Sequence, residues 1–199
     1  MGEQAVYVEK LSHGLVTRDV DVHVVTFQDS GDGSIQEFEG IKISRITNPI
    51  ETHINILTWD LALMTEFERI SSDIFYSVEG AVDLIDSHEW TCVSAALLLK
   101  RAFNLPFLYT IHSLEEHRSN FAKEPLNIAI SNLEHLGVIE ADRILVKSHW
   151  MKSQIHRFHG DFNKKIDVIS ADSPQWIDEV VKTYEKTKQS KNTVLRREI

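Results

Sequence analysis

The 199-residue sequence contains one cysteine, Cys92. A single cysteine excludes an intramolecular disulfide and any metal site built on several thiolates. Cys92 falls within an apolar run that we expect to be helical, where a small buried core residue is the ordinary interpretation. The chain therefore has to form its core without covalent cross-links.

Positive charge and long apolar runs are also scarce. Lys and Arg number 21 against 30 Asp and Glu, which gives a formal net charge of -9. This balance argues against a partner such as nucleic acid or an anionic membrane surface. No apolar run reaches transmembrane length, and the first residues lack the basic start and apolar middle of a signal peptide. We therefore expect a cytoplasmic protein.

What the sequence does contain is a regular alternation of elements from about residue 82 onward. Short apolar runs, each typical of a strand with both faces covered, alternate with amphipathic stretches typical of helices. Together with two earlier strands, they predict six strands, at 21–27, 41–46, 82–86, 106–111, 143–147 and 166–170. Such alternation predicts an α/β fold, a doubly wound parallel sheet.

Helices are expected around these strands from the spacing of apolar residues and from capping signals. One spans 54–78, with Ser71-Ser72-Asp73 as a candidate break point, and the others span 3–17, 91–103, 124–141 and 148–158. A final amphipathic helix is expected over 173–185, with Trp176, Val180 and Tyr184 packed on the domain. The polar remainder, 186–199, is expected to fray.

Two successive strands each lead to a histidine. His88, followed by Glu89 and Trp90, comes two residues after 82–86, and His112 directly follows the apolar run 106–111. In open α/β sheets, ligands bind outside the carboxyl ends of the strands. We therefore expect both histidines at one ligand-binding edge.

The residues around this pair resemble motifs of the GT-B glycosyltransferases, most of all the glycogen and starch synthases. His88-Glu89-Trp90 is similar to the His-(Asp/Glu)-Trp motif of that family, and Thr110-Ile111-His112 to its Thr-(Ile/Val/Thr)-His motif. Glu116–Ser119 resembles the residues that introduce the next helix, and Glu140-Ala141-Asp142 resembles a tripeptide before a later strand. The resemblance covers nearly the whole chain.

The resemblance implies a Rossmann-like, amino-terminal GT-B domain over 1–171, followed by a returning carboxy-terminal helix and tail over 172–199. It also implies that the first strand of the family, which would be central in the sheet, is missing here, and that the second, donor-binding domain is absent. The slot of that strand would be filled by another segment, another chain or a dimer.

The activity implied is that of a retaining glycosyltransferase, which moves glucose from ADP-glucose or UDP-glucose to an α-glucan or other sugar acceptor. His112 would be catalytic, and His88, Glu89, Trp90 and Arg118 would bind the substrate on the acceptor side. No cofactor and no metal are implied beyond the donor sugar. Without the donor-binding domain the chain is not expected to be active alone, so whether it is an enzyme by itself stays open. The partners considered are a second GT-B domain in trans and another copy of the chain.

Each candidate residue also has a structural interpretation. His112 can cap a strand end, Glu89 can cap the helix that begins near Thr91, Trp90 can pack beneath that helix, and Arg118 can be a solvated loop residue. A metal site among the three histidines at 149–159 would need a carboxylate or cysteine partner. We expect those three, His149, His156 and His159, on the surface.

Two other functions compete with the enzyme hypothesis. The first is a non-catalytic α/β domain that binds a glucan or a partner synthase. The second is an unrelated nucleotide-binding domain, which the lack of a Gly-rich fingerprint after 21–27 argues against.

Overall fold

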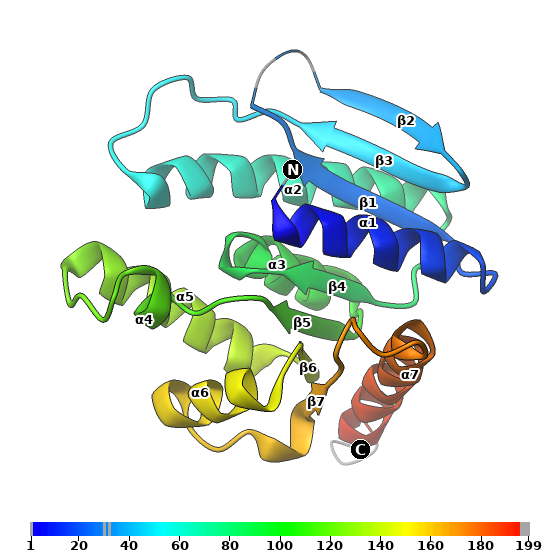
Figure 1. Ribbon diagram of the computed structural model, residues 1–199. Coiled ribbons are helices and arrows are strands. Elements are labelled where there is room, and N and C mark those ends of the chain that lie inside the picture. Colours follow the sequence, from blue (N-terminus) through cyan, green and yellow to red (C-terminus); the bar gives the residue numbers. More distant parts are fainter. Residues whose placement is uncertain (1, 30, 32, 196–199) are drawn as a thin grey trace. The chain divides into compact units, whose positions relative to one another are not determined.

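The computed structural model describes residues 2–29, 31 and 33–195. Its regular elements, labelled in Figure 1, are α1 (Glu3–Val16), β1 (Val22–Phe27), β2 (Ser34–Phe38), β3 (Ile41–Ile46), α2 (Ile56–Ser77), β4 (Ile85–His88), α3 (Val93–Phe103), β5 (Phe107–Ile111), α4 (Glu115–Arg118), α5 (Pro125–Glu140), β6 (Arg143–Val146), α6 (His149–His159), β7 (Ile166–Val168) and α7 (Trp176–Leu195). They form two compact units, Met1–Ala81 and Val82–Ile199, which we describe in turn. Among the described helices, none combines the length and the apolar character that a bilayer crossing requires.

The first unit is a three-stranded sheet in the order β1-β3-β2, contacted by α1 and α2. β1 and β3 are parallel, with Val22 opposite Ile41 and Phe27 opposite Ile46. The core of this unit is formed by apolar side chains of both helices and of β3, namely Tyr7, Leu11, Leu15, Ile41, Ile46, Leu63 and Phe67. The strands predicted at 21–27 and 41–46 are therefore confirmed.

β2 is an element that the sequence analysis missed. All five of its residues are exposed, so the strand lacks the alternation of buried and exposed residues that marks a half-buried strand. It joins β3 through Glu39 and Gly40, whose φ angles of 50° and 80° are both positive, as in the primed turns of tight hairpins. β2 is consequently antiparallel to β3, which corrects the prediction that every strand is parallel.

α2 is one continuous helix, so the break considered at Ser71-Ser72-Asp73 does not occur. Its first turn is closed by a capping box, in which the Asn55 side chain accepts N–H bonds from Leu57 and Thr58 and the Thr58 hydroxyl accepts the Asn55 N–H. Within the proposed break, the Ser72 hydroxyl donates to a Glu68 carboxylate oxygen at 3.1 Å, across one helical turn. The polar triplet is thus accommodated on the surface of the helix.

Asp60 is an acidic side chain buried in α2. It is 3% exposed, and its Oδ1 atom has no hydrogen-bond partner among the described residues. Burial raises the pKa of this carboxyl to about 7, against about 3.9 in an unfolded chain. Because the folded state holds the proton more tightly, the contribution of Asp60 to stability is complete below about pH 4 and is lost as the pH rises through 7.

We expect Asp60→Asn to raise the free energy of unfolding by about 2–4 kcal/mol at pH 8 and to leave it nearly unchanged at pH 4. Urea denaturation at the two pH values measures this difference. Asp73→Asn, on the exposed side of the same helix, is the matched control and should change stability by less than about 0.5 kcal/mol. If the free energy of unfolding of Asp60→Asn depends on pH in the same way as that of the parent chain, the raised pKa does not belong to Asp60.

The second unit is a four-stranded parallel sheet in the order β4-β5-β6-β7. β5 is buried along its whole length, and α3 and α5 pack on each other and on this strand. α5 comes so close that a Cβ atom at Gly137 would lie 2.7 Å from the Tyr109 ring, which explains the glycine. The alternation of parallel strands and helices predicted from residue 82 onward is confirmed.

The predicted number of strands is wrong, and so is the predicted boundary of one of them. The described residues contain seven strands instead of six, because β2 is added, and they are arranged as a three-stranded sheet in the first unit and a four-stranded sheet in the second. In addition, β4 begins at Ile85 and includes His88, although the sequence analysis placed this strand at 82–86. The segment after β5, for which the sequence analysis gave no element before 124, contains a short helix, α4.

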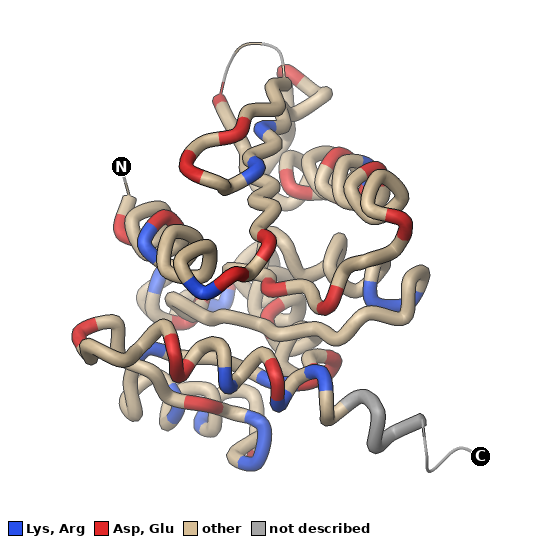
Figure 2. Tube along the Cα trace, turned by 90° about the vertical axis from the view of Figure 1, so that its right-hand side faces the viewer, with Lys and Arg blue, Asp and Glu red and all other residues tan. Residues whose placement is uncertain are grey.

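α7 packs on β5 and β6, as expected for the final helix. Val180 is fully buried, Ile177 is 7% exposed, and the Tyr184 hydroxyl donates to Asp86 at 2.8 Å. Trp176, expected in this contact, is only half-buried. The helix extends to Leu195, so the prediction of a frayed tail from 186 is wrong as far as 195, and 196–199 lie outside the described residues. Acidic and basic residues are interspersed along it, as Figure 2 shows.

We expect Val180→Ala to lower the free energy of unfolding by roughly 1–3 kcal/mol, because it removes two fully buried methyl groups and leaves a cavity. Val181→Ala, one position along the same helix and only half-buried, is the matched control. Thermal or urea unfolding of the two variants measures the difference. Equal effects at both positions would show that α7 does not pack through this face.

Candidate functional site

Two histidines from neighbouring strands meet at the carboxyl edge of the four-stranded sheet. His88 is the last residue of β4 and lies opposite Thr110, and His112 directly follows β5. His88 Nδ1 and His112 Nε2 are 2.9 Å apart, and the ring planes differ by 27°. The expectation that both histidines share one edge is confirmed.

A buried carboxylate orients the first of these rings. Asp86 Oδ2 lies 3.4 Å from His88 Nε2, and Asp86 also accepts hydrogen bonds from the Thr110 hydroxyl at 2.7 Å and from the Tyr184 hydroxyl at 2.8 Å. Burial acts to raise the pKa of Asp86, but the interactions with His88, Thr110 and Tyr184 outweigh it, so the pKa is lowered. An ionised Asp86 favours the proton of His88 on Nε2, which leaves Nδ1 to accept the Nε2–H of His112.

His112 is a neutral imidazole at ordinary pH. Burial, which is the largest cause, lowers its pKa to about 3 together with the electrostatic effects of His88 and Lys147, against a smaller opposing effect of Asp86. A neutral ring carries one N–H donor and one acceptor nitrogen. His112 can therefore form directional hydrogen bonds but does not serve as a cation.

Glu89 fixes the loop that carries His112. Its Oε1 atom accepts the backbone N–H groups of His112 and Ser113, both at 2.8 Å, and the Ser113 hydroxyl lies 3.2 Å from Oε2. Its own φ of 69° is rare for a residue with a side chain, which indicates that the surrounding contacts impose it. The interpretation of Glu89 as a cap of the following helix is wrong, since its side chain makes no cap hydrogen bond there.

Arg118 connects three carboxylates. Its guanidinium lies 3.3 Å from Glu89, 3.0 Å from Glu115 and 2.6 Å from Glu134, and Nη1 donates to the Ser113 hydroxyl at 2.7 Å. The alternative of a solvated loop arginine is therefore wrong. The structure places Arg118 beside the His112 loop, where its donors bind protein groups.

Trp90 packs in the interior. It is 8% exposed, and the short 3₁₀ turn Trp90–Cys92 that contains it contacts α3 and α5. This burial agrees with the structural interpretation, in which the indole supports the next helix. Its predicted contact with substrate stays a prediction.

A cluster behind the His112 loop was not identified from the sequence. Glu134 on α5 is fully buried, and its two oxygens each lie 3.0 Å from the Glu115 N–H. Burial raises the pKa of Glu134 to about 7, against the lowering effects of the Glu115 N–H and Arg118. Glu116 and His159 lie beside Glu134 and are each 6% exposed. The cluster thus gathers three ionisable side chains from three helices.

His159 corrects the expectation that the histidines at 149–159 lie on the surface. His149 and His156 are exposed as expected, but His159 is buried. The sequence signal was available, because Met151, Ile155 and His159 recur every four residues on the buried face of α6. The carboxylates that accompany His159 are distant in sequence, so the helical spacing alone did not reveal them.

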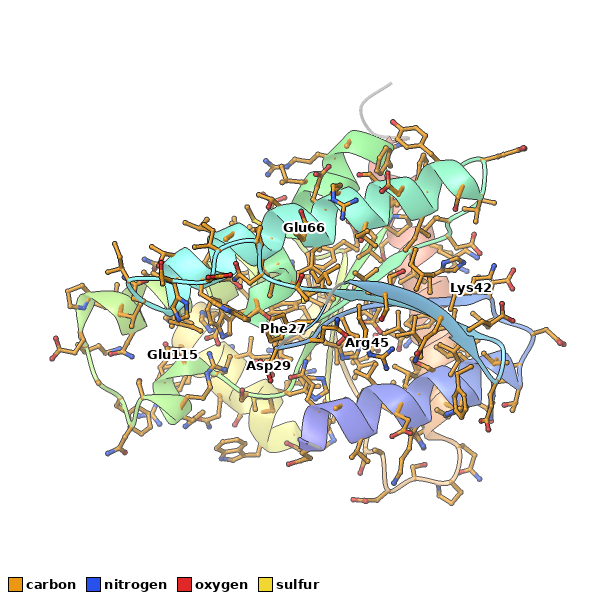
Figure 3. The ribbon with its side chains drawn as sticks, turned by 90° about the horizontal axis from the view of Figure 1, so that it is seen from above. Phe27, Asp29, Lys42, Arg45, Glu66 and Glu115 are labelled. Atoms are coloured by element: carbon orange, nitrogen blue, oxygen red, sulfur yellow. The ribbon has the colours of Figure 1, made fainter. Side chains whose placement is uncertain are left out.

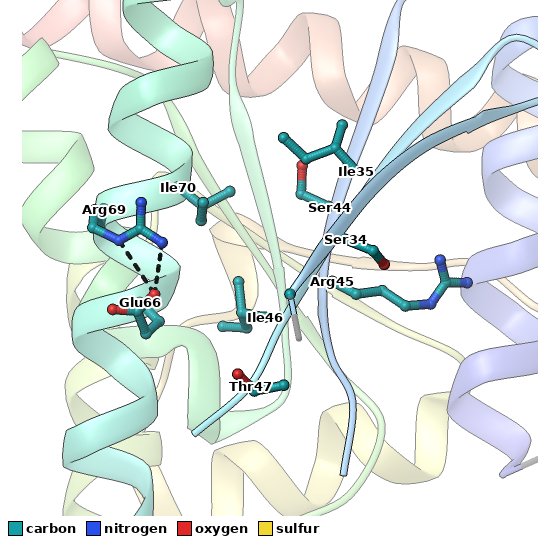
Figure 4. Close-up of a pocket in the computed structure, with 10 residues that line it drawn as sticks. Ser34, Ile35, Ser44, Arg45, Ile46, Thr47, Glu66, Arg69 and Ile70 are labelled. Carbon is teal, nitrogen blue, oxygen red and sulfur yellow. Dashed lines mark hydrogen bonds and ion pairs between the residues drawn. The ribbon is translucent and has the colours of Figure 1, made fainter. Parts of the chain in front are cut away.

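The first unit contains a pocket of about 270 Å³, drawn in Figure 4. It lies between the β2–β3 hairpin and α2, and none of its lining residues was a candidate from the sequence. Figure 3 shows Lys42 and Arg45 extending from β3 and Glu66 on α2. Glu66 forms an ion pair with Arg69 at 2.8 Å across one helical turn, so these two charges compensate each other.

Comparison with known proteins gives one family and two curated relatives. The sequence pattern of Glycosyltransferase Family 4 matches residues 4–171. An uncharacterized glycosyltransferase of Bacillus subtilis is 30% identical over 141 residues, and one of Methanocaldococcus jannaschii is 25% identical over 172 residues. These matches cover 65% and 85% of this chain but only 38% and 42% of the relatives, so the chain spans about two fifths of their length.

The fold is similar to that of sucrose-phosphate synthase from Thermosynechococcus elongatus. One solved chain of that protein aligns with a TM-score of 0.67 and 17% identity over 92% of this chain and 93% of its own length. Another aligns with a TM-score of 0.69 and 21% identity over 85% of this chain and 42% of its own length. At these identities the similarity establishes the fold alone.

Proposed function

The chain belongs to Glycosyltransferase Family 4 and has the fold of an amino-terminal GT-B domain, and from this premise we propose that it is the acceptor-side domain of a retaining, nucleotide-sugar-dependent glycosyltransferase. The observation that carries the proposal is the contact of 2.9 Å between His88 and His112 at the carboxyl edge of two parallel strands. That edge is where open α/β sheets bind ligands.

The chemistry of glycosyl transfer fits what this edge offers. The reaction passes through an oxocarbenium-like transition state, in which hydrogen bonds to sugar hydroxyls strengthen as charge develops. Such hydrogen bonds accelerate transfer only if the donor groups are held in place beforehand. Glu89 holds the backbone of His112, and His88 holds its ring, so His112 is pre-positioned as a neutral hydrogen-bonding group.

We propose glucose from ADP-glucose or UDP-glucose as the transferred sugar and an α-glucan as the acceptor. His112 would contact the sugar that is transferred, and His88 would line the acceptor side. Asp86 is held ionised at this edge, and the Arg118 guanidinium is already paired with carboxylates, which disfavours an anionic nucleotide there and favours a neutral glucan. The nucleotide would then rest mainly on a donor-binding domain.

Calorimetry tests this division of roles. We expect α-1,4-glucan oligomers to bind the chain more tightly than ADP-glucose or UDP-glucose, with a β-1,4-linked glucan oligomer as the control ligand. Because the fold neighbour is named a sucrose-phosphate synthase, a phosphorylated hexose belongs in the same series. Tight binding of a nucleotide sugar, or robust transfer by the 199 residues alone, would contradict the proposal.

The non-catalytic alternative makes a different prediction. A domain that only binds a glucan or a partner synthase would bind the α-1,4-glucan oligomers as tightly as an enzyme half would. It would show no transfer after a cognate donor-binding domain is supplied in trans. Recovery of transfer in that mixture therefore distinguishes an enzyme half from a binding module.

A further inference from the structure

Three buried side chains from three different helices of the second unit converge behind the His112 loop. They are Glu116 on α4, Glu134 on α5 and His159 at the end of α6, and each is at most 6% exposed. One carboxylate oxygen from each glutamate and one ring nitrogen of the histidine all lie within 4.8 Å of one another. Imidazole and carboxylate groups are common ligands of metal ions in proteins.

Two atoms of these side chains are buried without a hydrogen-bond partner among the described residues. They are Glu116 Oε2 and His159 Nε2. The other oxygen of Glu116 accepts the Ser131 hydroxyl at 2.7 Å, which fixes the carboxylate in this orientation. Leaving a buried polar atom without a partner destabilises the folded state, because the atom has lost its hydrogen bonds to water. Two such atoms on side chains that converge therefore indicate a ligand that satisfies both.

The charge around the cluster favours a cation. Arg118 forms ion pairs with Glu89, Glu115 and Glu134, and Glu116 adds a fourth carboxylate. Lys123, which is exposed, interacts with Glu116 from the solvent side and offsets only one of these charges. A divalent ion would compensate the negative charge that remains, in a region where desolvation makes uncompensated charge costly.

The distances fit one shared ion better than a direct contact. His159 Nε2 lies 4.0 Å from Glu134 Oε2, which is too long for a hydrogen bond. Two ligands that are each about 2.0–2.2 Å from a zinc ion lie roughly 3.4 Å apart in a tetrahedral arrangement. This pair thus requires a small inward shift of side chains, and the widest pair of the set, at no more than 4.8 Å, requires a shift of up to roughly 1.4 Å.

We propose that Glu116, Glu134 and His159 bind one divalent transition-metal ion, with Zn²⁺ as the best match. An imidazole ligand favours zinc over Mg²⁺ and Ca²⁺, which select oxygen ligands. The ion links α4, α5 and α6, and α4 directly follows the loop that carries His112. Its role is structural: it holds this part of the domain in place and takes no part in the chemistry at His112.

Metal titration of the full 199-residue chain tests the site. After treatment with a chelator and its removal, we expect calorimetry with ZnCl₂ to show one equivalent bound per chain. At a free zinc concentration about 100 times the dissociation constant, the melting temperature should rise by roughly 5 °C or more. Co²⁺ should give the visible absorption bands of a protein-bound ion, and MgCl₂ and CaCl₂ should have no effect at the same concentration.

Variants at the ligands decide whether the bound ion occupies this cluster. His159→Gln and Glu116→Gln should each weaken zinc binding at least about 100-fold and remove the Co²⁺ bands. His149→Gln, an exposed histidine of the same helix, is the matched control and should retain both. Circular dichroism confirms that each variant is folded.

The proposal fails if the parent chain binds no zinc, or if both ligand variants bind it as tightly as the parent. None of these measurements depends on sugar binding or transfer. Failure of the metal site and failure of the proposed glycosyltransferase function are therefore separate results.

Discussion

Replacing His112 with alanine is expected to reduce sugar transfer on the order of 10²–10³-fold when a cognate donor-binding domain is supplied. The loss follows from the position of the ring, which Glu89 fixes through the backbone and His88 fixes through a 2.9 Å contact. Because the hydrogen bond from His112 would strengthen in the transition state, the loss should fall mainly on kcat. Initial rates with a radiolabelled nucleotide sugar and a glucan oligomer measure it.

A matched control and a pH profile separate this role from a structural one. His149→Ala, which removes an exposed histidine after β6, should leave the rate unchanged. Since the pKa of His112 is lowered to about 3, the ring stays neutral, and we expect no inflection from His112 between about pH 5 and 8. The role proposed for His112 is contradicted if His112→Ala reduces the rate of transfer by less than tenfold. It is also contradicted if the pH profile of the parent chain has an inflection between about pH 5 and 8 that this variant lacks.

Arg118→Ala is expected to lower the free energy of unfolding by about 3–5 kcal/mol. The substitution leaves Glu134, which is fully buried, without the guanidinium that lies 2.6 Å from its carboxylate. Glu89 and Glu115 lose the same partner. Urea denaturation in metal-free buffer measures the change, because a bound cation would mask part of it.

Two further variants test the cause of that loss. Arg101→Ala removes an arginine that is 67% exposed and paired with Glu140, so it should cost no more than about 1 kcal/mol. Adding Glu134→Gln to Arg118→Ala should recover part of the stability, since it neutralises the charge left buried. If the double variant is no more stable than the single one, buried charge at Glu134 is not the cause.

Much of the second unit was predictable because its signals are local. Short apolar runs identified β5 and β6 to within a residue, and Pro125 and Ser148 marked the starts of α5 and α6. The meeting of His88 with His112 also followed from the sequence, because the carboxyl ends of successive parallel strands lie at one edge of the sheet. No three-dimensional information was needed for that inference.

Only the tertiary structure decided how these residues are held and which others join them. Glu89 reaches the His112 backbone 23 residues along the chain, and Arg118 reaches Glu134 across 16 residues. β2 carries no burial pattern because it is an exposed edge strand, and the buried state of His159 becomes meaningful only beside Glu116 and Glu134. The pattern of a sequence reports which face of an element is apolar, whereas ion pairs and candidate ligand sets depend on which elements pack together. The sequence alone therefore determined the α/β class and the edge that carries the histidines, and packing determined the network behind that edge.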